Sequence, residues 1–246
     1  MNKWIKIYFS GVFMGAADIV PGVSGGTIAF ILGVYERLIS ALSGVNKESI
    51  QLLFKGDIKA LWRHFDGTFL TVLGFGILTS LALLSGAISH ALEFYPRYLS
   101  SFFLGLILAS AVLLSKDVSQ FKRHYIGIVL LGVTFGVFIT LLSPSNIDAT
   151  PIMVIVSGMI AICAMLLPGI SGSFILLMLG MYGPVLLAVK SLQLDILSLF
   201  ALGALLGLLS FSKFLKYLMT HFKDVTISFL IGVMLGSLLK IWPWVI

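Results

Sequence analysis

The chain has 246 residues, of which 59% are hydrophobic and only 11% charged, and its mean hydropathy is +1.11. Soluble domains carry about 25% charged residues, so this composition excludes a soluble protein and indicates an integral membrane protein. The net charge of +6 does not indicate nucleic-acid binding, because positive residues in a membrane protein mainly mark the side on which its loops lie. The single cysteine, Cys163, excludes an internal disulfide.

The first apolar run, residues 4–42, imitates a secretory signal peptide at its start. We reject that interpretation because residues 11–37 recur at 158–184 with 10 identities in 27 ungapped positions, which a cleaved leader has no reason to show. At 1.5 Å per residue the run would span about 58 Å, too long for one crossing of a hydrocarbon core of about 30 Å.

A motif inside this run, PGVSGG at residues 21–26, predicts where the run breaks. Proline removes a backbone donor and glycine loosens the backbone, so we expect two half-helices folded into a re-entrant hairpin. A near-copy, PGISGS at residues 168–173, predicts a second hairpin over about 151–190. Breaks at membrane depth are tolerated only where protein or water covers the freed backbone groups, and paired breaks indicate a transport site.

Residues 43–66 form the one substantial polar segment, in which apolar and charged residues alternate. This spacing predicts an amphipathic helix at the membrane surface, and a partner-binding role is the alternative. Full spans follow at about 67–90, 97–115 and 124–143, and two more after the second hairpin at about 195–219 and 225–244.

A second stretch of repeat sets the register of the two copies. Residues 101–110 match 228–237 at five of ten positions, at an offset of 127 instead of 147, so the first copy carries 20 extra residues where the polar segment lies. We therefore predict a single membrane transport domain, residues 1–246. It comprises a first repeat at about 4–115, a linking span at 124–143 and a second repeat at about 151–246.

The basic residues predict the orientation of the spans. Hairpins contribute no net crossing, so the three spans between them place the second hairpin on the opposite face. Thirteen of the sixteen Lys and Arg residues then fall on one side, which we take as cytoplasmic together with the N-terminus, and only three fall on the external side with the C-terminus: Arg97, Lys190 and Lys240. The fold class is thus an all-α membrane protein with an inverted-topology repeat, two broken-helix hairpins and about five full spans.

Each motif opens a new half-helix, where Ser24 or Thr27, and Ser171 or Ser173, are the candidate N-caps. Unpaired N–H groups at such a start attract anions, and glycine permits close approach to the backbone. We therefore predict a substrate site for a phosphate or a carboxylate. The alternative is that the glycines only permit close helix packing. The predicted phosphate-binding residues are Gly22, Ser24, Gly25, Gly26, Thr27, Gly169, Ser171, Gly172 and Ser173.

Asp18 lies three residues before Pro21, inside the apolar run. Because intramembrane acids are by default functional, Asp18 is the candidate proton carrier, with capping of a freed backbone donor as the alternative. Its counterpart in the second copy is Met165, so the repeat does not require an acid there. Arg97 is a candidate for recruiting an anionic headgroup, and an interfacial anchor is the other interpretation.

At these residues the chain resembles the PopT family of bacterial polyprenyl-phosphate (undecaprenyl-phosphate) translocases, formerly a domain of unknown function. The resemblance rests on GAADIVPGVSGGT at 15–27 with GVYE at 33–36, and on LPGISGS at 167–173 with GMY at 180–182. It covers essentially the whole chain. It implies a multi-pass protein of the bacterial cytoplasmic membrane that returns the lipid carrier from the outer to the inner leaflet for reuse in cell wall biogenesis.

Two other function classes are the alternatives. A permease for a small soluble anion would use the same paired breaks. A lipid-phosphate phosphatase would need a histidine nucleophile, but the four histidines lie at span ends or in loops, away from the motifs. We therefore expect no catalytic residues, no cofactor and no metal site. The expected partners are a polyprenyl-phosphate lipid and the bilayer, without nucleic acid.

Overall fold

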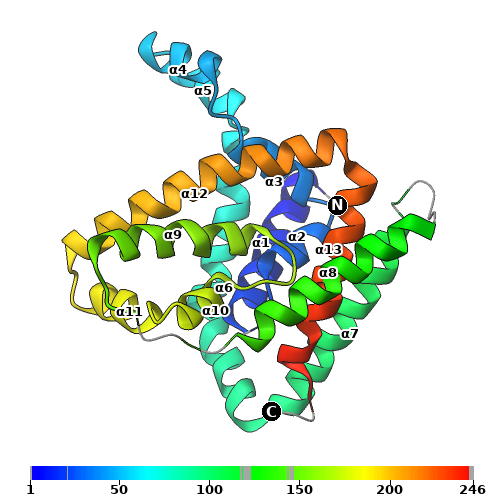
Figure 1. Ribbon diagram of the computed structural model, residues 1–246. Coiled ribbons are helices and arrows are strands. Elements are labelled where there is room, and N and C mark those ends of the chain that lie inside the picture. Colours follow the sequence, from blue (N-terminus) through cyan, green and yellow to red (C-terminus); the bar gives the residue numbers. More distant parts are fainter. Residues whose placement is uncertain are drawn as a thin grey trace.

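The computed structural model describes residues 2–20, 22–116, 118, 123–142, 144 and 147–243, with backbone only at 123 and 124. All regular structure within these residues is helical, as the sequence predicts. The elements, shown in Figure 1, are α1 (Lys3–Ile19), α2 (Gly25–Ile31), α3 (Tyr35–Leu42), α4 (Lys47–Phe54), α5 (Ile58–His64), α6 (Gly67–Phe94), α7 (Pro96–Ser115), α8 (Arg123–Leu141), α9 (Pro151–Leu166), α10 (Gly172–Met178), α11 (Tyr182–Lys190), α12 (Leu194–His221), α13 (Lys223–Ser237) and the 3₁₀ helix η1 (Leu238–Ile241).

The chain is a multi-pass membrane protein. Of the described helices, α6, α7, α12 and α13 continued by η1 are long and apolar enough to cross a membrane, and the count rises to six if each bent helix pair is one span. The five predicted spans coincide with α6, α7, α8, α12 and α13–η1. For α8 the described apolar part, Tyr125–Leu141, is shorter than the others.

Each re-entrant unit contains three helices, so the expectation of two half-helices was wrong in number. A second bend of 119° separates α2 from α3, and one of 113° separates α10 from α11. Gly33 causes the first of these bends. It has φ +69°, and the N–H groups of Gly33 and Val34 bond back to the carbonyls of Phe30 and Ala29. This Schellman arrangement ends a helix without any proline.

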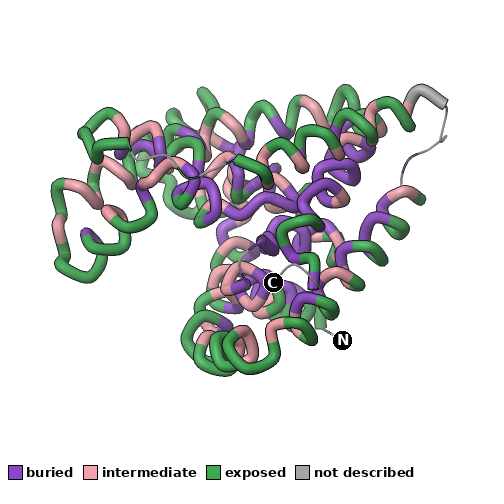
Figure 2. The backbone as a smooth tube through the Cα atoms, turned by 60° about the horizontal axis from the view of Figure 1, so that its bottom comes forward, coloured by how far each residue is buried: buried purple, intermediate pink, exposed green. Residues whose placement is uncertain are grey.

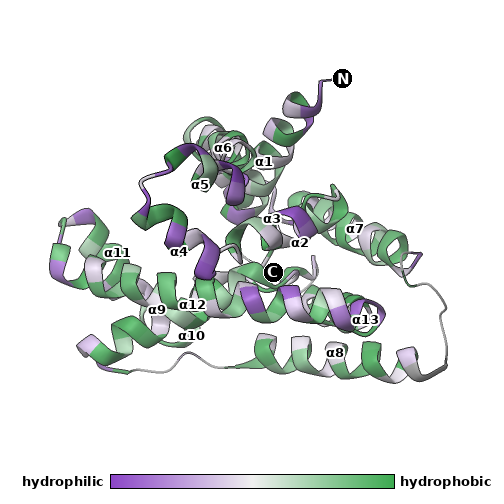
Figure 3. Cartoon of the chain, turned by 90° about the horizontal axis from the view of Figure 1, so that it is seen from above, coloured by the Kyte–Doolittle hydropathy of each residue, from purple (hydrophilic) through white to green (hydrophobic). Residues whose placement is uncertain are grey.

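The polar segment forms two short helices, so the single helix expected over residues 43–66 was also wrong. Gly56, with φ +69°, separates α4 from α5. Phe54, Ile58 and Trp62 are exposed, and charged residues lie between them, as Figure 3 shows by hydropathy. Both helices stand out from one end of the body in Figure 1. The location of this segment at the membrane surface stays a prediction from its alternation of apolar and charged residues.

Glycine residues bring three pairs of helices into close contact. A Cβ atom added at Gly15 in α1 would lie 2.7 Å from the carbonyl oxygen of Ile77 in α6. At Gly158 in α9 it would lie 2.5 Å from the carbonyl oxygen of Phe200 in α12, and at Gly136 in α8 it would lie 2.6 Å from that of Val233 in α13. Such small residues let helix backbones approach each other in a membrane, where water drives no association.

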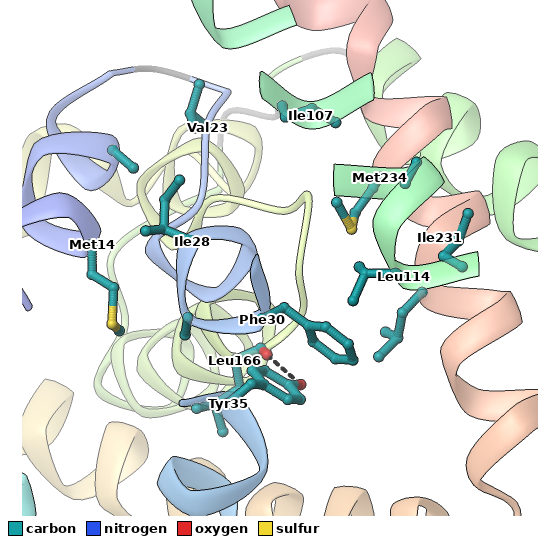
Figure 4. Close-up of a cluster of buried hydrophobic side chains, with 14 of the residues drawn as sticks. Met14, Val23, Ile28, Phe30, Tyr35, Ile107, Leu114, Leu166, Ile231 and Met234 are labelled. Carbon is teal, nitrogen blue, oxygen red and sulfur yellow. Dashed lines mark hydrogen bonds between the residues drawn. The ribbon is translucent and has the colours of Figure 1, made fainter. Parts of the chain in front are cut away.

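The helix α13, continued by η1, is more buried than the other long apolar helices α6, α7 and α12. Ile227, Leu230 and Met234 are at most 1% exposed, and Figure 2 shows the buried residues gathered in the middle of the helices, with exposed faces outside. Met234 and Ile231 pack in one apolar cluster with Val23, Ile28 and other residues of the first hairpin (Figure 4). Because the tips of both hairpins pack near α13, this helix positions the candidate site.

The contact between α1 and α6 yields a test of glycine packing. Replacing Gly76 by Ala would place a Cβ atom against the backbone of α1 at Tyr8 and Val12, and we expect the free energy of unfolding to fall by about 1–3 kcal/mol. The measurement is denaturant unfolding of the purified protein in detergent micelles. Gly74→Ala in the same helix is the control, because nothing lies within 4 Å of its added Cβ. Equal stability of the two variants would contradict the packing role.

Candidate functional site

The two repeated motifs form turns of the same backbone shape. Gly22 and Gly169 both have φ +88°, a left-handed conformation that favours glycine. In each copy an extended Ser then precedes a seven-residue helix, Ser24 before α2 and Ser171 before α10. Pro21, on which the first break was predicted, lies outside the described residues. The sequence repeat is therefore a structural repeat at the breaks.

The predicted N-caps differ between the copies. Ser24 caps α2, because its Oγ accepts a hydrogen bond of 3.1 Å from the N–H of Gly26. Ser171 holds the N-cap position of α10, but its hydroxyl bonds instead to the Oγ of Ser173 at 2.8 Å. Thr27 caps nothing and lies fully buried inside α2.

The two hairpin tips touch each other. The N–H of Gly169 donates to the Oγ1 of Thr27 at 2.8 Å, and the Oγ of Ser24 donates to the carbonyl of Leu167 at 3.5 Å. The hydroxyl of Tyr35 donates to the carbonyl of Leu166 at 2.8 Å (Figure 4). Backbone groups at the second break thus find their partners in side chains of the first hairpin.

Asp18 links the end of α1 to the start of α2 across the first turn. Its Oδ1 accepts a hydrogen bond of 2.7 Å from the N–H of Gly25, so the carboxylate caps α2, as the alternative interpretation held. A Cβ atom at position 25 would lie 2.6 Å from the Asp18 carboxylate, which makes glycine necessary there. The counterpart residue Met165 is 41% exposed. Of the two turns, only the first therefore has an acidic side chain bonded to a backbone N–H group.

The predicted site residues are brought together, but with unequal access. Gly22, Ser24, Gly25, Gly26 and Thr27 are all buried, and so are Gly169 and Ser171. Gly172 is half-buried and Ser173 is exposed. Arg97 is exposed in the first turn of α7, and it is not among the described residues that line the clefts beside the turns.

The C-terminal segment contributes residues that the motif analysis missed. A Cβ atom at Gly169 would lie 2.9 Å from the Cα of Met234 and 3.1 Å from the Oγ of Ser237, and one at Gly22 would lie 2.9 Å from the Cγ of Lys240. Met234, Ser237 and Lys240 recur every three residues, so one face of α13–η1 touches both turns. The sequence pattern used Lys240 only to predict the orientation of the spans. The signal for a site residue was a lysine near the end of an apolar span.

Clefts of different size adjoin the two turns. A crevice of about 10 Å³, room for about one water, lies between the two left-handed glycines and Lys240. Beside it a cleft of about 200 Å³ is lined by Ser173, Phe174, Leu177, Tyr182 and Lys240. An apolar cleft of about 340 Å³ lies between α1, α2 and α7. The arrangement offers room for an anionic headgroup beside apolar surface.

The described residues were expected to form no metal site. Among the described residues, no group of three or more His, Cys, Asp and Glu side chains is placed to hold a metal ion.

Comparison with known proteins gives consistent matches over nearly the whole chain. Residues 14–246 match the family model described as undecaprenyl phosphate translocase-like. A polyprenyl-phosphate transporter of Vibrio cholerae serotype O1 is 48% identical over 242 residues, covering 98% of this chain and 79% of the relative. A polyprenyl-phosphate transporter of Staphylococcus aureus is 35% identical over 261 residues, covering 98% and 87%. No solved structure gives a significant match.

The contact between the hairpin tips can be tested by removing one hydroxyl. Thr27→Val keeps the side-chain shape but leaves the buried N–H of Gly169 without its acceptor, which costs about 1–3 kcal/mol of unfolding free energy. Thr27→Ser should retain most of the stability. Thr134→Val is the matched control, because the hydroxyl of Thr134 is exposed and bonds only within its own helix to Leu130. Denaturant unfolding in micelles measures all three, and a Thr27→Val protein as stable as the control would refute the contact.

Proposed function

Because the chain belongs to the undecaprenyl phosphate translocase-like family, we propose that it moves a polyprenyl-phosphate lipid carrier, undecaprenyl phosphate, across the bacterial cytoplasmic membrane. The direction is from the outer to the inner leaflet, so that the carrier is recycled. The observation that carries this proposal is the meeting of two repeated turns at one site, through Thr27 and Gly169. The names of the two relatives as polyprenyl-phosphate transporters support it.

The phosphate is proposed to bind between the two turns, at the small and hydroxyl residues predicted from the motifs. In the closed arrangement the N–H groups of Gly25, Gly26 and Gly169 already have partners. A phosphate therefore binds by displacing these partners as the hairpins separate. Glycine at the turns permits its close approach, and the hydroxyls of Ser24 and Ser171 donate to it once they are released from Leu167 and Ser173.

A proton on Asp18 is proposed to accompany the lipid. Inward movement of a negative headgroup opposes an inside-negative potential by about 2.3 kcal/mol per charge per 100 mV, and a proton moving with it offsets that cost. The carboxylate of Asp18 occupies the N–H of Gly25, so it competes directly with a phosphate for this donor. Protonation of Asp18 weakens its hydrogen bond from the N–H of Gly25 and frees this donor for the phosphate. Proton uptake is thereby coupled to phosphate binding.

The proposed topology follows from the basic residues. The N-terminus is cytoplasmic, the C-terminus is external, and the two repeats form one transport domain in opposite orientations. Figure 1 supports this grouping, since α4, α5 and the α12–α13 turn lie at one end of the protein, whereas the α6–α7 turn lies at the other. Arg97, in the first turn of α7, would then face the external headgroups.

Leaflet exchange provides the direct test of transport. The purified protein is placed in vesicles, and exchange of undecaprenyl phosphate is followed beside a soluble-anion control, inorganic phosphate. We expect the lipid to exchange at least about tenfold faster than in protein-free vesicles, because a polar path lowers the barrier for the charged headgroup. Movement of the soluble anion alone would favour the second candidate, a permease.

A substitution at Asp18 tests its proposed role as the proton carrier. Asp18→Asn keeps a side-chain oxygen that can accept from Gly25, so we expect a folded protein whose exchange rate no longer responds to a pH gradient. The rate under an inside-negative potential should fall by up to about tenfold per 60 mV, because one charge then moves uncompensated. The control is Asp195→Asn, the same chemical change at an exposed residue of α12. An unaltered pH response in Asp18→Asn would exclude the proton role.

A further inference from the structure

We propose that Lys240 is the cation that binds the phosphate monoester of the substrate, in the cleft between η1, α10 and α11. This inference rests on the proposed transport function and identifies the first binding position along the path. The cleft has a volume of about 200 Å³ and adjoins the crevice of about 10 Å³ between the two turns, with which it shares Phe174 and Lys240.

The Lys240 side chain is held in place by both hairpins. Its stem packs on the first turn, where a Cβ atom at Gly22 would lie 2.9 Å from the Lys240 Cγ. Its Nζ lies 4.5 Å from the centre of the Phe174 ring in the second hairpin. An ammonium over an aromatic ring is stabilised by the cation–π interaction and still has donors for an anion. The charge therefore sits at the junction of the two repeats.

The cleft presents further polar groups beside this charge. Ser173 is exposed in it, with its hydroxyl bonded to Ser171, and Tyr182 is 42% exposed in it. One ammonium and two hydroxyls suit the three oxygens of a phosphate monoester better than the two oxygens of a carboxylate. Leu177 and Phe174 complete the lining, and no acidic side chain is among the described residues that form it. Apolar surface beside the charge fits a lipid whose chain remains in the bilayer.

The polar residues of this cleft have no equivalent polar and accessible partners at the corresponding described positions of the first repeat. At the offset of 147, Tyr182 corresponds to Tyr35, which is 2% exposed and bonded to the carbonyl of Leu166. At the offset of 127, Lys240 corresponds to Leu113. Of the two equivalent positions, only the second therefore combines a lysine with an exposed tyrosine. Given the proposed topology, this position faces the external leaflet, from which the phosphate is taken.

Two measurements on the same preparations test the inference. Equilibrium binding of radiolabelled undecaprenyl phosphate to the purified protein is compared with its leaflet exchange in vesicles. Lys240→Met keeps the stem without the charge, and we expect its half-saturating concentration in both assays to rise about tenfold or more, as for loss of a charge-assisted hydrogen bond. Lys240→Arg should stay within about threefold of the unaltered protein, since it keeps the charge. Lys190→Met, an exposed lysine of α11, should change neither assay.

A second pair of variants covers the case that Lys240→Met fails to fold. Tyr182→Phe removes one hydroxyl from the cleft, and we expect binding to weaken by about threefold to tenfold, whereas Tyr98→Phe on the exposed face of α7 should have no effect. Inorganic phosphate is the second probe. If inorganic phosphate competes with the lipid in the unaltered protein but not in Lys240→Met, the site binds phosphate groups in general. If only the lipid binds in a Lys240-dependent way, the site is specific for the lipid headgroup.

The outcomes separate the inference from the transport proposal. Binding that depends on Lys240 without any leaflet exchange would refute transport and keep the site. Exchange with equal half-saturation in Lys240→Met and the unaltered protein would refute the site and keep transport. Equal losses in Lys240→Met and Lys240→Arg would show that the side chain serves packing, which also overturns the inference.

Discussion

The need of buried backbone groups for hydrogen-bond partners governs this structure. Two helices break inside an apolar protein, and each break frees N–H and carbonyl groups that the hydrocarbon of a bilayer cannot satisfy. The protein supplies the partners from its own side chains: Asp18 accepts from Gly25, Thr27 accepts from Gly169, and Tyr35 donates to Leu166. The bonds of Thr27 and Tyr35 join the two hairpins, so any ligand that enters between them must replace the bonds it breaks.

The two repeats share a backbone but differ in their ionisable residues. Asp18 corresponds to Met165 and Lys240 corresponds to Leu113, so the negative charge lies in the first copy and the positive charge in the second. A symmetric frame can adopt two equivalent arrangements, whereas unequal charges make the two ends chemically different. In the proposed transport the lysine end recruits the phosphate and the aspartate end governs its passage.

Much of the fold could be predicted from residue patterns. The five spans, both breaks and the paired glycines at 22 and 169 follow from apolar length and from a repeat that is visible by eye. The second bends at Gly33 and Gly180 were missed, although both glycines stand in the aligned repeat. A lone glycine is tolerated in many helices, so only the observed left-handed φ values distinguish these two as helix ends.

Local chemistry alone determined that the chain lies in a membrane, that it breaks at two proline–glycine motifs and that an acid stands beside the first. These features depend on neighbours within a few residues. Only the tertiary structure decided that the tips meet through Thr27 and that Lys240 lies against both Gly22 and Phe174. Contacts across more than sixty residues depend on how helices pack, and here the glycine-lined helix pairs set that packing.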